Sequence, residues 1–416
     1  MKEPGDSASF VYPMRLLFFV LFWLVTASAT AQSITISGRV SDRETKEPLP
    51  YASVYIKGKA IGTITNLQGE FDFHVPQEFR NEMLVVSMLG YANFESPVWA
   101  MPSGLPTTIE LNAAAILLKE VVVQDSLLGA DIFRIALRRI RQNYPMKPFL
   151  LEGFYRDVKK VGGTYISLLE AAVEIYDESY AEPRNKFKLR ERVRLLEVRK
   201  SLGYESKFTT YFDQVNLLED LLLYNDVRYR QFPEEDIFFN GLERKPSTTY
   251  DGNEVYVISH TKEYKLTIYI DKITYGILHL DFESNLMNDD SKKQSMISRF
   301  VYVKREINFR KIQNKLYLSY LSMDSKINWY DIETNELKFE TALYQQLLIN
   351  RVTPNTNERI KSVEKMRNYS LQFQDLPYNK TFWDNYNVIK ETPLDKKIIE
   401  DIEKAGPLDK QFEGKY

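Results

Sequence analysis

The stretch GTITNLQGEFDFHVP, residues 62–76, decides the fold of the N-terminal part of the chain. It reads as a β-hairpin, because a short extended run leads into the turn 66–69 and a segment of alternating polar and apolar residues follows until Pro76. Gly69 suits a turn position with positive φ, which glycine adopts without steric cost. The period of two places three apolar side chains on one face of the second strand: Phe71, Phe73 and Val75. These residues are expected to have core and turn roles rather than catalytic ones.

Short alternating segments occur on both sides of this stretch, at residues 33–40, 52–56, 83–88 and 107–111. Polar loops separate them, for example DRETKEPLP at residues 42–50, which ends in proline. Short strands with turn residues between them are typical of a β-sandwich. Residues 32–123 are therefore predicted to form one small all-β unit.

Three segments of this unit resemble the carboxypeptidase regulatory-like domain: ISGRVSDRETKEPLPYASVYIKGKAIGTITNLQGEFDFHVP, LVVSMLGYANFE and IELNAAAILLKEVVV. The resemblance covers residues 34–123 and implies a seven-stranded, transthyretin-like sandwich. It also implies a non-catalytic accessory module of envelope proteins, which occurs beside zinc carboxypeptidases and in front of TonB-dependent receptors. Because one fold serves many functions, the resemblance does not settle the activity.

The N-terminus carries the pattern of a secretory signal peptide. Arg15 precedes the unbroken apolar run of residues 16–25, which is too short for the about 20 residues that span a bilayer. The small residues Ala29 and Ala31 follow, so cleavage is expected before Gln32 and the signal peptide is residues 1–31. A retained membrane anchor is the weaker alternative, and either Met1 or Met14 is the true start. No later stretch reaches 18 consecutive apolar residues, so the mature chain is predicted to be exported, without a transmembrane segment, to the periplasm or outer-membrane periphery.

The composition excludes several classes of function. The formal net charge of −2 gives no basic surface for nucleic acid, and the absence of cysteine excludes disulfides and thiolate metal sites. The three histidines include a His260-x-x-Glu263 pair, but it sits at the end of a predicted strand, in which positions i and i+3 face opposite sides. His260 and His279 are expected on strand surfaces. We therefore expect no zinc site, no cofactor and no enzyme.

The rest of the chain is predicted to be a second, α+β domain. A connecting amphipathic helix is expected within residues 124–148. The favoured interpretation is that its apolar face packs on a sheet and its basic face lies in solvent; the alternative is that the helix lies on an anionic membrane surface. Residues 149–374 read as an antiparallel β-rich domain with a helical insert near 213–230, and residues 375–416 as a docking segment with a short helix. The fold class is thus mainly β, a sandwich followed by a domain with a large curved antiparallel sheet.

The segment YDGNEVYVISHTKEYKLTIYIDKITYGILHLDFES weakly resembles the half-barrels of periplasmic lipoprotein carriers, which implies an apolar ligand. One strand face there, Leu278, Leu280 and Phe282, is the candidate surface for it. Three functions stay open. The leading one is a non-catalytic envelope protein that binds or presents a protein partner through its sandwich; the others are a carrier of a lipid or other apolar ligand, and a carbohydrate-binding accessory protein that uses the many aromatic residues.

Overall fold

The computed structural model describes residues 33–102, 104–114, 127–205, 210–212, 217–285, 290–293, 295–366, 371–390 and 393–414. The predicted signal peptide and its cleavage site at Ala29, Ala31 and Gln32 lie outside these residues, so they stay predictions. Within the described part, no helix is both long enough and apolar enough to span a lipid bilayer.

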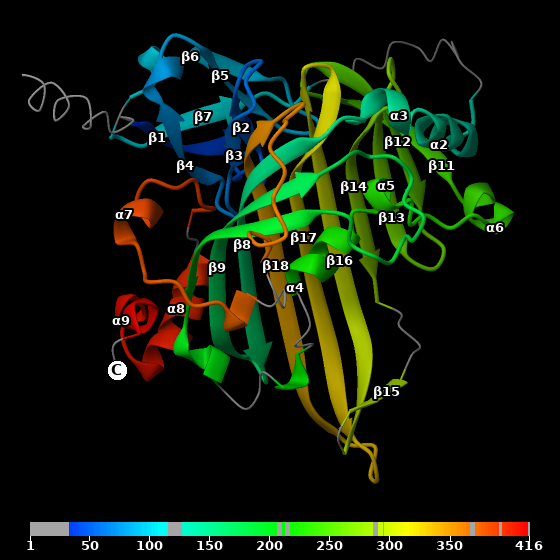
Figure 1. The fold of residues 1–416 in the computed structure, drawn as a ribbon. Coiled ribbons are helices and arrows are strands. Elements are labelled where there is room, and N and C mark those ends of the chain that lie inside the picture. Colours follow the sequence, from blue (N-terminus) through cyan, green and yellow to red (C-terminus); the bar gives the residue numbers. More distant parts are fainter. Residues whose placement is uncertain are drawn as a thin grey trace, which may run out of the picture.

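In the described residues, the N-terminal part is a sandwich of seven strands in two sheets (Figure 1). One sheet has the order β4-β1-β7 and the other the order β3-β2-β5-β6. The strand bounds are β1 Ser33–Asp42, β2 Ser53–Ile56, β3 Gly62–Ile64, β4 Glu70–Pro76, β5 Met83–Ser87, β6 Phe94–Pro97 and β7 Thr107–Leu111, with short 3-10 turns η1 Gln77–Phe79 and η2 Val98–Ala100. Side chains from both sheets, including Ile36, Val54 and Phe71, are fully buried between them. The predicted seven-stranded sandwich is confirmed.

The prediction that residues 62–76 form a β-hairpin is wrong. β3 pairs with β2, whereas β4 pairs with β1 in the opposite sheet, so the turn carries the chain from one layer to the other. The Asn66 side chain holds this turn by accepting hydrogen bonds from the backbone N–H groups of Gln68 at 2.9 Å and Glu70 at 2.8 Å. Local alternation fixes which face of a strand is apolar, but it does not select the strand's partner.

Eleven strands of the described residues form one large antiparallel sheet in the second part of the chain. Ten follow the order β10-β9-β8-β18-β17-β16-β14-β13-β12-β11, and β15 adds to β16. Their bounds are β8 Phe149–Val161, β9 Thr164–Asp177, β10 Arg192–Lys200, β11 Glu243–Tyr250, β12 Asn253–His260, β13 Lys265–Asp271, β14 Ile277–Ser284, β15 Asp290–Lys293, β16 Met296–Ile312, β17 Lys315–Asp331 and β18 Leu337–Thr353. Together with the sandwich, this sheet confirms the predicted mainly β fold class.

Both faces of this sheet are covered. Neighbouring residues of one strand enter different cores: Tyr155 packs with the helices, whereas Phe154 packs on the other side with Trp383. We call the first side the helical face and the second the sandwich face. The helical face is covered by α2 Gly129–Arg138, α3 Ile140–Asn143, α4 Leu217–Leu223, α5 Asp226–Tyr229 and α6 Asp236–Asn240. The sandwich face carries the sandwich and the C-terminal helices α7 Lys380–Trp383, α8 Pro393–Ile402 and α9 Leu408–Glu413, with α7–α9 at the left edge of Figure 1. The 3-10 turns of this domain are η3 Leu202–Glu205, η5 Leu371–Phe373 and η6 Glu403–Ala405.

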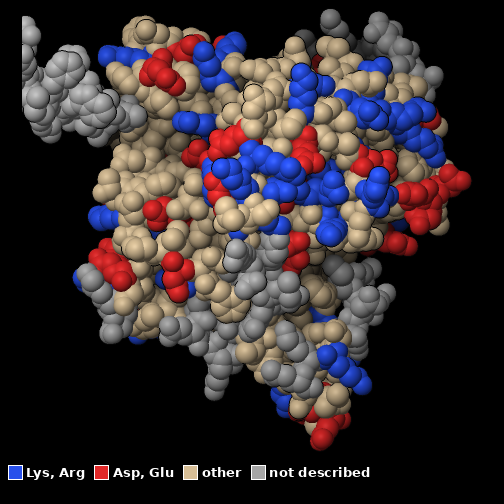
Figure 2. Space-filling model, viewed as in Figure 1, with Lys and Arg blue, Asp and Glu red and all other residues tan. Residues whose placement is uncertain are grey.

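The segment expected to form one connecting helix forms α2 and α3, which meet at Arg139. Two of its basic residues lie over aromatic rings: the guanidinium of Arg134 is 4.3 Å from the ring centroid of Phe239, and that of Arg139 is 4.9 Å from that of Tyr275. These cation–π contacts accord with a helix packed on the sheet. Figure 2 shows Lys and Arg side chains gathered near the centre of the viewed face, with acidic side chains beside them.

The close fit of Gly69 leads to a test. Gly69 has a φ of +72°, and a Cβ at this position would collide with the Val40 carbonyl oxygen. Gly58 has nearly the same φ, +71°, but a Cβ there would meet nothing within 4 Å. We expect Gly58→Ala to lower the free energy of unfolding by about 1–2 kcal/mol from the backbone conformation alone, and Gly69→Ala to lower it further. Equal losses in chemical denaturation would show that the contact with Val40 is unimportant.

Candidate functional site

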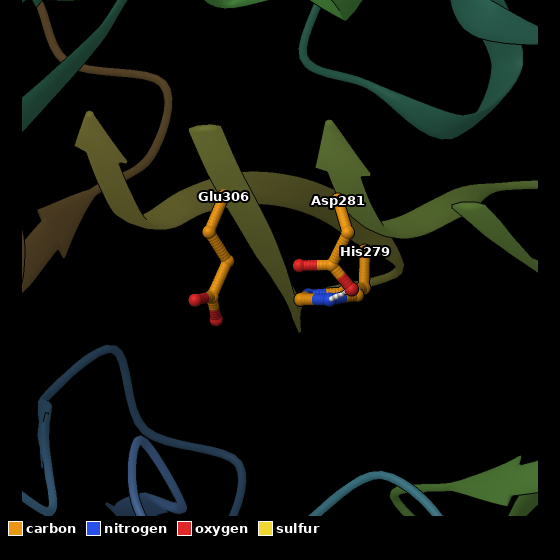
Figure 3. A group of neighbouring side chains, drawn as sticks. All are labelled: His279, Asp281 and Glu306. Carbon is orange, nitrogen blue, oxygen red and sulfur yellow. Dashed lines mark hydrogen bonds and ion pairs between the residues drawn. The ribbon is translucent and has the colours of Figure 1, made fainter. Parts of the chain in front are cut away.

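A cluster of polar side chains lies on the sandwich face where β14 and β16 pair. His279 is directly opposite Asn308, and Asp281 is directly opposite Glu306. In a pleated sheet, positions i and i+2 of one strand and their cross-strand partners share a face. Figure 3 shows His279, Asp281 and Glu306 projecting to the same side of these strands.

Hydrogen bonds connect the members of this cluster. His279 Nε2 lies 2.8 Å from Asp281 Oδ2, and His279 Nδ1 contacts the side-chain oxygen of Asn308. The Asn308 amide nitrogen donates to Glu306 Oε1 at 3.1 Å. Since both ring nitrogens face oxygen acceptors, a doubly protonated imidazolium satisfies every contact.

The cluster shifts the pKa values of its members. Burial lowers the pKa of His279, but the Asp281 carboxylate outweighs burial and raises that pKa to about 9. Burial acts to raise the pKa of Asp281, yet His279 holds it below its ordinary value. Burial raises the pKa of Glu306. A histidine between two carboxylates is therefore cationic at neutral pH in the absence of other ligands.

The prediction that His260 and His279 are ordinary strand-surface residues is wrong. His260 is 6% exposed and His279 is 9% exposed. The His260 ring lies between those of Phe238 and Tyr264, with centroid separations of 5.8 and 4.8 Å. Both histidines are buried because the sheet is covered on two sides, which the strand pattern alone does not reveal.

The same cluster contains a donor set for a metal ion. His279, Asp281 and Glu306 each offer one nitrogen or oxygen atom, and these atoms lie within 4.8 Å of one another. The sequence does not reveal this set, since Glu306 is remote in sequence and joins the others only through the pairing of β14 with β16. The i, i+2 spacing of His279 and Asp281 on a predicted strand was the one available signal.

The structure places the candidate apolar ligand face in packed surroundings. Leu280 is fully buried on the helical face, in the same core as Phe133 and Leu221. Phe282 is partly buried, with the Arg305 guanidinium 4.6 Å from its ring centroid. Leu278 stands at an irregularity of the β13–β14 pairing and borders a cavity of about 30 Å³ between sandwich and sheet. These residues do not line one continuous free surface.

The sandwich itself has an open hollow of about 460 Å³. It lies beside β6 and β7, the strands at the edges of the two sandwich sheets. Its lining is mostly polar and comprises Arg43, Ala92, Asn93, Phe94, Thr108, Glu110, Leu111 and Asn112. An edge strand beside a hollow is a position at which another polypeptide segment can add.

Other parts of the sandwich are fixed on the second domain. Tyr51 stacks on Tyr320 with ring centroids 5.5 Å apart, and its hydroxyl lies 3.2 Å from that of Tyr344. The C-terminal segment makes a second contact with the sandwich. The Asn387 side chain accepts a hydrogen bond from the His74 backbone N–H at 2.7 Å and donates one to the His74 carbonyl at 3.3 Å.

Gly62, the first residue of the stretch quoted above, is part of the same contact. Arg310 of β16 donates to the Ile61 carbonyl at 3.3 Å, and a Cβ on Gly62 would collide with its guanidinium. The glycine therefore makes room for a buried arginine that joins the two parts of the chain.

The histidine cluster predicts a pH dependence for the metal-free protein. A pKa of about 9 in the folded state, above the ordinary 6.5, means that the cluster stabilises the fold fully below pH 6.5 and loses this contribution as pH rises through 9. We expect NMR titration in EDTA to show His279 protonated up to about pH 9, and the Asp281→Asn variant to titrate at lower pH. His74, whose pKa burial lowers, serves as an internal control. Titration of His279 near or below pH 6.5 would contradict the assignment.

Comparisons with known proteins identify the N-terminal part. Residues 36–123 match the family model described as the CarboxypepD_reg-like domain. The TonB-dependent receptor SusC of Bacteroides thetaiotaomicron is 36% identical over 94 residues, which are 23% of this chain and 9% of the receptor. The TonB-dependent receptor P3 of Formosa agariphila is 28% identical over 110 residues, 26% of this chain and 10% of the receptor. This chain thus matches about a tenth of the length of these relatives.

Among solved structures, matches include an outer membrane lipoprotein-sorting protein domain of Vibrio parahaemolyticus and a LolA superfamily protein of Nitrosomonas europaea. Both are 12% identical; they cover 54% and 59% of this chain and 93% and 100% of their own, with TM-scores of 0.22 and 0.18. Scores of this size carry no argument about the second domain. The family match and the seven observed strands agree on the first domain: residues 36–123 are a CarboxypepD_reg-like domain.

Proposed function

We propose that this protein is an exported, non-catalytic component of the cell envelope that binds a partner protein through its CarboxypepD_reg-like sandwich. The periplasm or the outer-membrane periphery is the proposed location. The similarity to TonB-dependent receptors over this one domain and the signal-peptide pattern in the sequence support the envelope assignment.

The observation that carries the proposal is the open hollow between the edge strands β6 and β7. Tyr51, Ile61 and His74 contact the second domain and do not line this hollow. Asn93, at one end of the hollow, donates to Asp251 of the second domain at 3.1 Å. Binding along β7, at Thr108 and Glu110, therefore leaves the contacts of Tyr51, Ile61 and His74 with the second domain in place.

The chemistry of the edge suits an extended peptide segment. Among the described strands β7 pairs only with β1, and the residues after it pair with residues 90–92, where the Ala92 N–H donates to the Asn112 carbonyl at 2.9 Å. The backbone groups of Thr108 and Glu110 that face away from β1 are therefore the ones offered to a partner. Its side chains at Thr108 and Glu110 are exposed, while Ile109 and Leu111 are buried. A partner strand would gain backbone hydrogen bonds from β7 and side-chain contacts from Arg43 and Asn112 in the hollow.

Site-specific photo-crosslinking in the native host tests this proposal. With the crosslinker at Thr108 or Glu110, we expect a discrete adduct with one envelope protein, in which the crosslinked peptide is an extended segment. The matched control is Glu78, which is exposed on the same sandwich but lies in η1, away from the hollow. Adducts of equal yield at Glu78, or none at Thr108 and Glu110 while the protein is folded and exported, would overturn the proposal.

A carrier of an apolar ligand is the second candidate. The observation in its favour is that the apolar helical face is covered by the short helices α4, α5 and α6, of 7, 4 and 5 residues. Helices of this length are held by packing rather than by their own stability, so a ligand can compete for the same face.

Native mass spectrometry of protein purified from its own envelope distinguishes this function. A carrier is expected to bring a lipid with it, and Phe282→Ala on the helical face is expected to reduce the bound fraction several-fold. Tyr302→Ala is the control, because Tyr302 lies across from Lys326 on the sandwich face. A measured mass equal to that of the mature chain alone, with no bound lipid, would contradict the carrier function.

A further inference from the structure

We infer that His279, Asp281 and Glu306 form a binding site for one divalent transition-metal ion of the zinc type. The site goes beyond the proposed partner binding and does not depend on it, since it lies on the large sheet rather than on the edge of the sandwich.

The donor set and its spacing fit such an ion. Zinc sites that keep an exchangeable position use three protein ligands, with metal–ligand distances of about 2.0–2.2 Å for imidazole nitrogen and carboxylate oxygen. Two such ligands at a tetrahedral angle lie roughly 3.3–3.6 Å apart. His279 Nε2 and Asp281 Oδ2 are 2.8 Å apart, so they have to separate slightly to bind one ion, and the three donor atoms all lie within 4.8 Å of one another. A small rotation of the flexible Glu306 side chain completes the set.

The surroundings orient the imidazole as a ligand. A metal-bound histidine almost always donates its other N–H group to an oxygen acceptor, which fixes the ring. Asn308 supplies this acceptor to His279 Nδ1, and its amide nitrogen also holds Glu306 at 3.1 Å. One side chain thus positions two of the three ligands, and all four residues stand on paired strands rather than on loops.

Charge and access also favour a cation. Asp281 and Glu306 face each other across two paired strands, an arrangement in which like charges repel. A divalent ion between them removes this repulsion more fully than the single charge of a protonated His279. The Asp281 side chain is 38% exposed, so an ion can reach the site from solvent. Imidazole in the donor set favours zinc over magnesium or calcium, which prefer oxygen ligands alone.

Isothermal titration of the full-length mature chain, first stripped with EDTA, with zinc chloride is the test. We expect binding of one ion per chain, a rise in melting temperature on zinc addition, and no saturable binding of magnesium chloride. His279→Ala should abolish saturable binding, and Glu306→Gln and Asn308→Leu should each weaken it by about 10- to 100-fold. Two variants should keep the wild-type affinity. One is His74→Ala, which removes a histidine on the sandwich. The other is Glu283→Gln, which removes a carboxylate on the same strand as His279 and Asp281 that pairs with Lys265 of β13.

The outcomes are decisive in both directions. Absence of zinc binding to the wild-type chain, or binding that survives His279→Ala in a folded protein, would overturn the proposal and leave the cluster as a protonated histidine between carboxylates. Circular dichroism checks the fold of each variant. If His279→Ala does not fold, the near-isosteric Glu306→Gln decides, and an unchanged affinity in that variant would also overturn the site.

Discussion

Burial of the large sheet on both faces is the constraint on which the rest of the structure depends. The central strands β16, β17 and β18 are each 17 residues long, and the stretches 307–310, 316–323 and 345–350 within them are buried on both sides. Apolar side chains then have to occupy both faces, as Tyr320 and Leu321 do in neighbouring positions and in different cores. Polar side chains in the same strands require partners within the protein, because an unpaired buried polar group is costly.

This requirement explains why the polar residues of the sandwich face occur in connected groups. The Tyr320 hydroxyl accepts a hydrogen bond from the Gln346 amide at 2.8 Å, and the Tyr320 ring stacks on the ring of Tyr51 in the sandwich. On the neighbouring strands, Asn308 bridges His279 and Glu306. The candidate metal site is thus the part of a polar layer that lies next to the domain contact, and a ligand there would bear on β14 and β16 without touching the sandwich edge.

Sequence patterns predicted the local structure well and the pairing of distant segments poorly. Alternation identified the strands of the sandwich, and spaced motifs such as Gly69-Glu70-Phe71 identified its family. The same alternation assigned residues 62–76 to a hairpin, because period two describes the faces of a strand and says nothing about which sheet it enters. The site was missed for the same reason. Glu306 is 25 residues from Asp281 in the sequence and lies opposite it only because of the register in which β14 and β16 pair.

The two candidate functions place opposite demands on the helical face, and its buried ion pairs favour one of them. Partner binding at β7 needs no movement of the helices, whereas a carrier has to displace α5 from the sheet. Arg228 of α5 bonds the Asp177 carboxylate at 2.6 and 3.0 Å, with both side chains 3% exposed. Asp226 of the same helix pairs with Arg305 of β16 at 3.1 Å. Separating one partner from a buried pair of this kind costs about 3–5 kcal/mol, so an open state is rare unless a ligand's own binding energy offsets that cost. A free, already formed edge on the sandwich has no such cost, which is why partner binding is the better-supported function.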